Sequence, residues 1–228
     1  MNFMQWLRSL DDLLYEVMAW LVFFPMTLWR SISRPLTMMN YADWELRDKE
    51  EEQFTETLSP PLFLILSLLI SHGIGLSLGG GTNPILASNR GLASLISDNT
   101  TLLLLRIVLF SIFPLMLAVR FVRASHTQLT RDGLKAPFYA QCYAAAPLAL
   151  IVGVGTALAH SRFAWLNGVA AVVVALAIVV YLIVQARWFS QHLETGMGRG
   201  MLNAAGGLFT ALVLALGIAI LFAGPTIT

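Results

Sequence analysis

The sequence predicts an all-α fold: a polytopic integral membrane bundle of about five spanning helices, preceded by N-terminal amphipathic helices. Of the 228 residues, 57% are hydrophobic and only 12% are charged, which is about half the charged fraction of an ordinary soluble domain. The apolar residues come in blocks of 18 or more with few or no charges, and a water-soluble core of this size would not produce such blocks. We therefore expect a lipid bilayer to surround most of the chain.

Five segments have the length and apolar character of spanning helices, because each is close to the ~20 residues that a hydrocarbon core of ~30 Å requires. They are residues 61–78, 101–121, 137–159, 163–184 and 203–224. Pro114 and Pro147 fall inside the second and third of these segments, where we expect them to kink the helix.

The basic residues predict the orientation of these spans. With the N-terminus on the cytoplasmic side, eleven of the 14 Lys and Arg residues fall in cytoplasmic segments. Only Arg90 and Arg162 fall on the other side, and Arg106 lies within a span. Because short cytoplasmic loops carry an excess of positive charge, we expect a protein of the plasma membrane, the inner membrane of a bacterium, with its N-terminus in the cytoplasm and its C-terminus outside.

Residues 1–39 predict amphipathic helices that do not span. The uncharged run Val17–Trp29 has only 13 residues and contains Pro25, so we expect a break there and a second short helix. These helices either lie on the cytoplasmic leaflet or pack against the cytoplasmic end of the bundle. The apolar positions that recur at helical spacing are Phe3, Leu7, Leu10, Leu14, Val17, Leu21 and Phe24.

Residues 41–58 carry seven acidic and two basic side chains, which indicates a solvated polar helix or linker. Ser59-Pro60-Pro61 follows and begins the first span, since proline is tolerated in the first turn of a helix. The sequence thus divides into a cytoplasmic and interfacial region, 1–58, and a transmembrane domain, 59–228.

Small residues recur every fourth position in two spans and predict close helix packing within the chain. A second stripe is available to face another subunit, as in a homo-oligomer. The positions are Ala145, Ala149, Gly153 and Ala157 in the third span, and Ala211, Ala215, Ala219 and Ala223 in the fifth.

Two ionisable side chains, His72 and Arg106, lie inside spans, where such groups are costly and therefore informative. Counted from the outer helix ends, they lie about 9 Å and about 7–8 Å deep, so they can share one level and form a small polar pocket with Ser71 and Ser111. An arginine there suits an anionic headgroup or substrate. Alternatively, Arg106 snorkels to the interface and a neutral His72 bonds a neighbouring helix.

Other chemistry has little support in the sequence. Gln141 favours a bond between helices and Tyr143 an interfacial position, while the single cysteine, Cys142, has no base nearby in the sequence. Four scattered histidines form no metal-ligand cluster, and a net charge of +1 gives no surplus for nucleic-acid binding. We expect no cofactor, no metal and no enzymatic activity.

Three strings carry a family resemblance: LWRSISRP at 28–35, SPPLFLILSLLISHGIGL at 59–76 and FYAQCYAAAPLAL at 138–150. Together with the acidic stretch between the first two, they resemble bacterial members of the Yip superfamily. The resemblance implies a five-pass bundle with a cytoplasmic N-terminal region, and bacterial relatives are often labelled permeases. The DLYGP-type motif of the eukaryotic Yip proteins is absent here, and the family supplies no catalytic residues.

Two functions follow from these features. The first is an accessory or scaffold subunit of a membrane assembly, whose region 1–58 contacts a protein partner or the leaflet. The second is a small permease or lipid-handling protein that works at His72 and Arg106. An Arg106 that faces the interior of the bundle without an acidic partner would need a ligand to pair with, so its direction separates the two functions.

Overall fold

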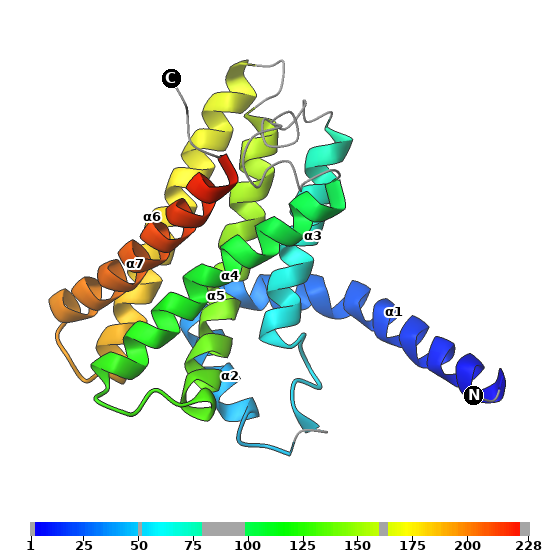
Figure 1. The fold of residues 1–228 in the computed structure, drawn as a ribbon, viewed down its shortest axis with the longest axis horizontal. Helices are drawn as coiled ribbons and strands as arrows, with labels where there is room; N and C mark the ends of the chain where they lie inside the picture. The colour runs from blue at the N-terminus through cyan, green and yellow to red at the C-terminus, as the bar shows by residue number, and fades with distance from the viewer. Residues whose placement is uncertain (1–2, 50–51, 79–98, 160–163, 224–228) are drawn as a thin grey trace.

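The computed structural model describes residues 3–49, 52–78, 99–159 and 164–223. Within these residues all the secondary-structure elements joined by turns and linkers are helices, as the sequence predicts (Figure 1). The helices are α1 (Phe3–Ser33), α2 (Pro35–Glu45), α3 (Pro60–Ser77), α4 (Asn99–Ala124), α5 (Arg131–Leu158), α6 (Ala164–His192) and α7 (Met197–Ala223).

Helices α3 to α7 correspond to the five predicted spans, with ends that agree to within one residue at 78 and 159, while residues 163 and 224 lie outside the described residues. By length and composition, six helices of the described chain are apolar enough to cross a membrane, the sixth being Ser9–Ser33 within α1. The chain passes up through α3, α5 and α7 and back through α4 and α6 (Figure 1). Consequently α2, the linker 46–59 and the turns after α4 and α6 lie at one end of the bundle, which we call the α2 end, and α7 finishes at the other.

Helix α5 is the centre of the bundle, because it contacts α1, α2, α3, α4 and α6, while α7 packs on α4 and α6. Its stripe of small residues meets α3: a Cβ added to Gly153 would lie 2.5 Å from the Oγ of Ser71, and one added to Gly75 would lie 3.7 Å from the Cβ of Ala157. This stripe therefore packs within the chain, as predicted. Only part of the α7 stripe packs within the chain: Ala211 is buried, whereas Ala219 is exposed.

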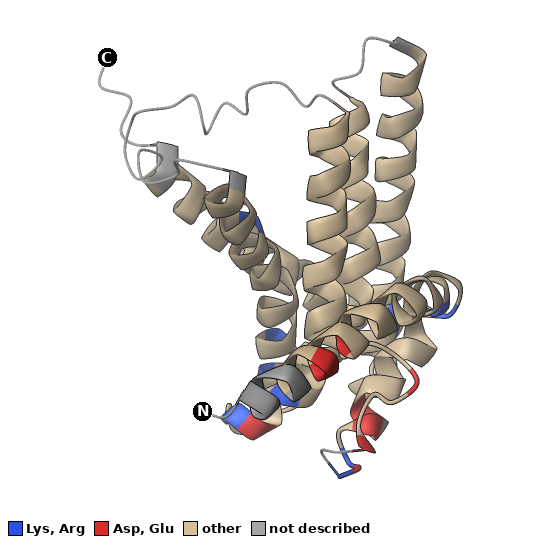
Figure 2. Cartoon of the chain, turned by 90° about the vertical axis from the view of Figure 1, so that its right-hand side faces the viewer, with Lys and Arg blue, Asp and Glu red and all other residues tan. Residues whose placement is uncertain are grey.

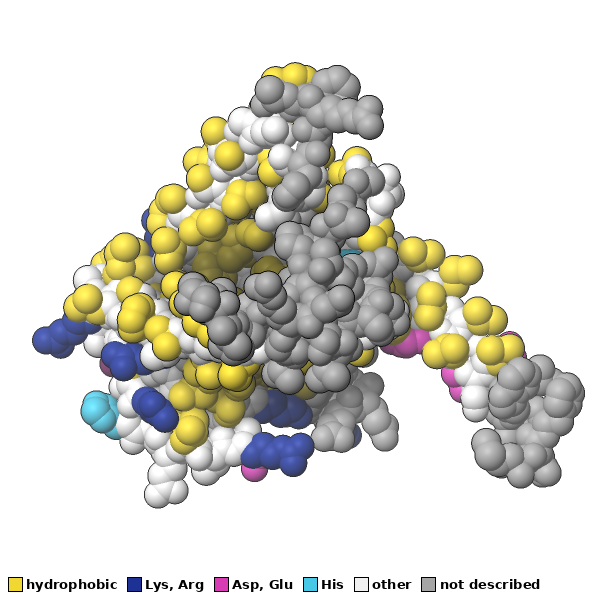
Figure 3. Space-filling model, turned by 45° about the horizontal axis from the view of Figure 1, so that its top comes forward, with side chains coloured by type: hydrophobic (Ala, Val, Ile, Leu, Met, Phe, Trp, Pro, Cys, Tyr) yellow, Lys and Arg dark blue, Asp and Glu magenta, His cyan; other side chains and the backbone are white. Residues whose placement is uncertain are grey.

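Apolar side chains cover the outside of the bundle. Valines and leucines along α6 and α7 are largely exposed, and Figure 3 shows hydrophobic side chains over the outer surface. A water-soluble protein rarely exposes contiguous apolar areas of this extent, so lipid is the solvent of these faces. Examples are Val172, Val173, Leu176, Val179, Leu212, Val213, Leu216 and Ile220.

The N-terminal region is helical as predicted, but the predicted break at Pro25 is wrong. Helix α1 continues through Pro25 to Ser33, and the break comes at Arg34, whose backbone is not helical (φ −138°, ψ 61°). Proline disfavours a helical conformation in the residue before it and is well placed in a helix's first turn, and Pro35 begins α2 in this way. Residues 9–18 are all exposed, and α1 projects sideways from the bundle (Figures 1 and 2).

Candidate functional site

The two ionisable residues of the spans meet between α3 and α4. An Nη1 atom of Arg106 lies 3.4 Å from Nδ1 of His72, and His72 is buried while Arg106 is partly buried. A guanidinium can only donate hydrogen bonds, so Nδ1 of His72 accepts and the ring is neutral with its proton on Nε2. The two side chains, which the sequence predicts at a similar depth, are thus adjacent.

Helix α5 forms the third wall of this site. The Nη2 atom of Arg106 lies 3.9 Å from the position that a Cβ on Gly153 would occupy, and Ser71 closes the other side of that glycine. Because glycine has no side chain, the guanidinium can approach the α5 backbone. Arg106 is therefore directed between α3 and α5, into the bundle.

Ser71 and Ser111 differ in their relation to Arg106. Ser71 is buried beside the site, although its hydroxyl donates to the Leu68 carbonyl at 2.9 Å. The Ser111 hydroxyl donates to the Ile107 carbonyl at 2.7 Å, and five residues beyond Arg106 it lies about 140° around α4. Helical geometry thus separates Ser111 from the other three predicted residues.

The site is rich in hydrogen-bond donors and poor in acceptors. Arg106 offers several N–H groups, His72 offers Nε2–H, and the one acceptor contact of Arg106 in the described residues is the weak one to His72. The ion pairs of the described chain lie elsewhere, between Arg30 and Glu56 and within α2 and its C-terminal extension. No group of metal-ligating side chains occurs in the described residues. This arrangement suits the binding of an anion.

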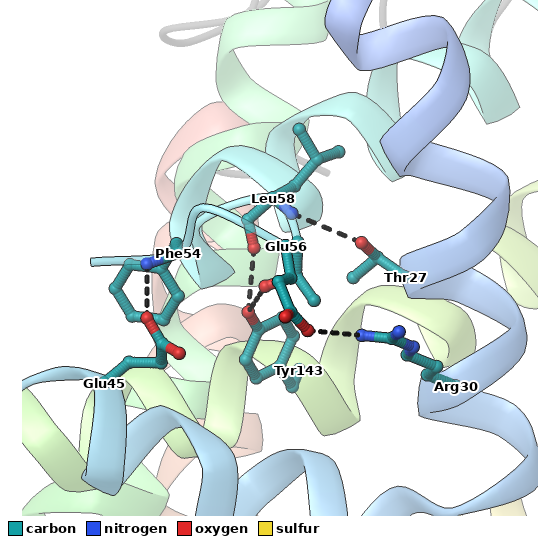
Figure 4. A network of polar contacts seen from close by, with 8 residues as sticks. Thr27, Arg30, Glu45, Phe54, Glu56, Leu58 and Tyr143 are labelled. Carbon is teal, nitrogen blue, oxygen red and sulfur yellow. Dashed lines mark hydrogen bonds and ion pairs between the residues drawn. The ribbon is translucent and has the colours of Figure 1, made fainter. Parts of the chain in front are cut away.

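A second polar cluster, which we call the clasp, lies at the α2 end (Figure 4). The hydroxyl of Tyr143 donates to the backbone carbonyl of Leu58 at 2.8 Å and lies 3.0 Å from the Thr57 hydroxyl. The Leu58 amide donates to the Thr27 hydroxyl at 3.2 Å, and Arg30 pairs with Glu56 at 3.9 Å. The clasp therefore joins α1, the linker and α5.

Aromatic rings complete the clasp. Phe54 lies 6.0 Å from Tyr139 and 6.5 Å from Tyr143 between ring centroids, and its amide donates to the Glu45 carboxylate. Phe54 has a φ of 57°, a left-handed conformation that non-glycine residues adopt at some cost. Burial first, and then the carboxylates of Glu45 and Glu56, raise the pKa of the neighbouring Tyr41 to about 12. The linker is thus held in place at its centre.

Glutamines join the centre of the bundle to α6. The Nε2 atom of Gln185 donates to Oε1 of Gln141 at 2.6 Å, and both side chains are 0% exposed. The predicted bonding of Gln141 between helices is therefore confirmed. Cys142 is buried next to it.

No protein-family model, curated protein or solved structure matches this chain. The resemblance to the Yip superfamily accordingly stays a prediction. Function has to be argued from the arrangement of this chain's own residues.

Sequence reasoning missed the clasp. It expected residues 41–58 to be solvated, but Thr57 and Leu58 are buried, and it expected Tyr143 at the interface, whereas that residue is buried inside the bundle. Hydrogen bonds between residues so far apart in the chain leave no local periodicity. The one available signal was Phe54, the only aromatic residue between Trp44 and Phe63 in an otherwise charged stretch.

Proposed function

We propose that this chain is a non-enzymatic integral membrane protein that binds an anionic ligand at Arg106 and His72, as a lipid-handling protein or small permease does. The observation that carries the proposal is the direction of Arg106, which points into the bundle against His72 and Gly153. Of the two functions expected from the sequence, this direction favours the second.

An arginine inside a bundle needs a counter-charge. A charge removed from water is costly unless it is paired, and no described carboxylate pairs with Arg106. The planar guanidinium can donate two parallel hydrogen bonds to a carboxylate or a phosphate. The shared chemistry of the ligand is therefore an anionic head, carried either by a lipid or by a small solute.

The proposed orientation places this site toward the outer leaflet of a bacterial inner membrane. Figure 2 shows Lys and Arg gathered toward the α2 end, and an excess of positive charge is typical of the cytoplasmic side. The N-terminus is then cytoplasmic and the C-terminus outside. The described basic residues of that end are Arg30, Arg34, Arg47, Lys49, Arg120, Arg123, Arg131, Lys135, Arg187 and Arg199.

Ligand-induced thermal stabilisation tests the proposal. The full chain in a mild neutral detergent is titrated with short-chain phosphatidylglycerol, with phosphatidylcholine of the same chain length, and with inorganic phosphate. We expect the anionic lipid or phosphate to raise the melting temperature. Arg106→Gln should weaken the apparent affinity at least tenfold, because hydrogen bonds to charged groups contribute about 1.5–3 kcal/mol.

The matched control is Arg123→Gln, which removes an exposed arginine near the other end of the same helix. A response to phosphatidylglycerol alone identifies a lipid ligand, and a response to phosphate identifies a small anion. Equal responses of Arg106→Gln, Arg123→Gln and the unchanged chain would overturn the proposal.

A second candidate function, an accessory or scaffold subunit, is favoured by α1. The first half of this helix exposes apolar side chains such as Leu13, Leu14 and Met18, while the clasp holds its second half through Thr27. A chain that begins at residue 19 keeps the clasp and removes the projecting half. A stoichiometric protein partner that the full chain retains in mild detergent, and that this shorter chain loses, would support the scaffold function through region 1–58. Gel filtration of the same samples reports any homo-oligomer.

A further inference from the structure

A groove of about 90 Å³ lies between α5, α6 and the junction of α1 with α2. Its long wall is apolar and is formed by α5 over residues 144–151 and by α6 over residues 177–184, a length of about 10 Å at the helical rise. Alanines at 144 and 177 leave the space that larger side chains would fill. On α5 the groove ends at Ile151, two residues before Gly153 and therefore about 200° around the helix from the Arg106 site.

Two hydroxyl groups at this groove have no hydrogen-bond partner in the described residues. They belong to Ser31 and Tyr181, whose side chains line the groove and are only 3% and 7% exposed. A buried hydroxyl without a partner costs free energy, and hydrocarbon chains alone cannot supply an acceptor. An occupant with both an apolar chain and oxygen acceptors would fill the groove and accept hydrogen bonds from both hydroxyls.

Basic side chains lie on the same side of the molecule. Arg34 is exposed and directly precedes Pro35, which lines the groove. Arg187 is also exposed, and it follows Val180 and Val184 of the groove by seven and three residues, which places these three residues on one face of α6. The end of the groove therefore carries positive charge at the level where a headgroup would lie.

We infer that this groove binds one anionic glycerophospholipid, with an acyl chain along α5 and α6, ester oxygens at the hydroxyls of Ser31 and Tyr181, and phosphate near Arg34 and Arg187. The surrounding faces of α6 are apolar and exposed to lipid, so a lipid reaches the groove without leaving the bilayer. Positive charge at the groove's end complements phosphate. This site is independent of the ligand proposed at Arg106.

Photochemical labelling tests the site in the full chain. The protein is reconstituted in phosphatidylcholine vesicles that contain a small fraction of phosphatidylglycerol with a diazirine in one acyl chain, and the labelled peptides are mapped by mass spectrometry. We expect labelling to concentrate on residues 144–151 and 177–184. Ala177→Phe fills the groove and should abolish this labelling. Ala175→Phe, at an exposed position on the other side of α6, should leave it unchanged.

A double variant, Ser31→Ala with Tyr181→Phe, tests the polar end without adding volume, and it serves equally if Ala177→Phe does not fold. We expect about a fivefold loss of labelling for each hydroxyl that is removed, as for one neutral hydrogen bond. Labelling spread evenly over the exposed faces of α6 and α7 and insensitive to Ala177→Phe would overturn the inference, as would full labelling of the double variant. Arg106→Gln should not change the labelling. The experiment therefore distinguishes a failure of the groove inference from a failure of the function proposed at Arg106.

Discussion

The hydroxyl of Tyr143, in the middle of the sequence of α5, donates a 2.8 Å hydrogen bond to the backbone carbonyl of Leu58, 85 residues earlier in the chain. The amide of the same Leu58 donates to the Thr27 hydroxyl of α1. One linker residue therefore ties the N-terminal helix to the centre of the bundle. Because α3 begins at Pro60, the same contacts set where the first predicted span enters the membrane.

Replacing Tyr143 with phenylalanine should loosen the linker. The change leaves the buried Leu58 carbonyl without this donor, which costs about 1–3 kcal/mol, and one or two kcal/mol corresponds to a factor of about 5–30 in the open population. Trypsin cleavage after the exposed Arg47 and Lys49 should accelerate by such a factor in mild detergent. Tyr139→Phe is the matched control, since the Tyr139 ring packs on Phe54 and keeps that packing. Equal cleavage of the two variants would show that the clasp does not hold the linker.

Alkaline pH should weaken the packing of α2 through Tyr41. Its pKa is raised from 10.0 to about 12, so the folded chain holds the phenol proton more tightly than the unfolded chain does. The stabilisation is therefore fully present below about pH 10 and is lost as the pH rises through 12. Titration followed by phenolate absorbance should show a step near pH 12 in the unchanged chain that is absent from Tyr41→Phe. A missing step near pH 10, as in an exposed tyrosine, would contradict this.

The bundle was predictable, and His72 and Arg106 could be singled out from the sequence, because the bilayer imposes strong local rules. Long apolar blocks, the placement of basic residues and the cost of intramembrane charge all act on the sequence directly. Those rules identified His72 and Arg106, which the structure places 3.4 Å apart. The small-residue stripe of α5 likewise predicted a close approach, although the identity of its partner, α3, was not encoded in the spacing.

The N-terminal region was less predictable because its decisive contacts are specific and distant. Pro25 and Pro35 have the same local effect on the backbone, yet only Pro35 marks a break. The rings of Phe24 and Phe63 lie 5.5 Å apart, so tertiary packing accompanies an uninterrupted helix at Pro25. The partners of Tyr143 and Phe54 were invisible for the same reason: neither periodicity nor charge pattern reports a contact across 85 residues.

Gly153 should tolerate no side chain. A Cβ at this position would lie 2.5 Å from Oγ and 2.6 Å from Cβ of Ser71, and because a rotation of Ser71 cannot move its own Cβ, the two helices would have to separate. We expect Gly153→Ala to lower the free energy of unfolding by about 1–3 kcal/mol, measured as thermal unfolding in detergent. It should also weaken the response to an anionic ligand, since Arg106 packs at the same glycine.

Gly73→Ala is the control for that substitution. A Cβ at Gly73 meets nothing within 4 Å, so alanine should improve the helix by about 0.5–1 kcal/mol through its higher helix propensity. The two changes are chemically identical and lie on helices that pack against each other. If both variants unfold at the same temperature, α3 and α5 do not pack at Gly153 as described.

The Gln141–Gln185 pair should show strong coupling in a double-mutant cycle. Nε2 of Gln141 and Oε1 of Gln185 have no partner in the described residues, and the one bond between the side chains is 2.6 Å long. Gln141→Leu or Gln185→Leu alone leaves a buried amide wholly unpaired, which costs about 1–3 kcal/mol. The double leucine variant removes every polar atom at similar volume, so it should unfold at a higher temperature than either single variant. Additive losses would instead mean that each glutamine has its own partner and that the bond between α5 and α6 contributes nothing to the fold.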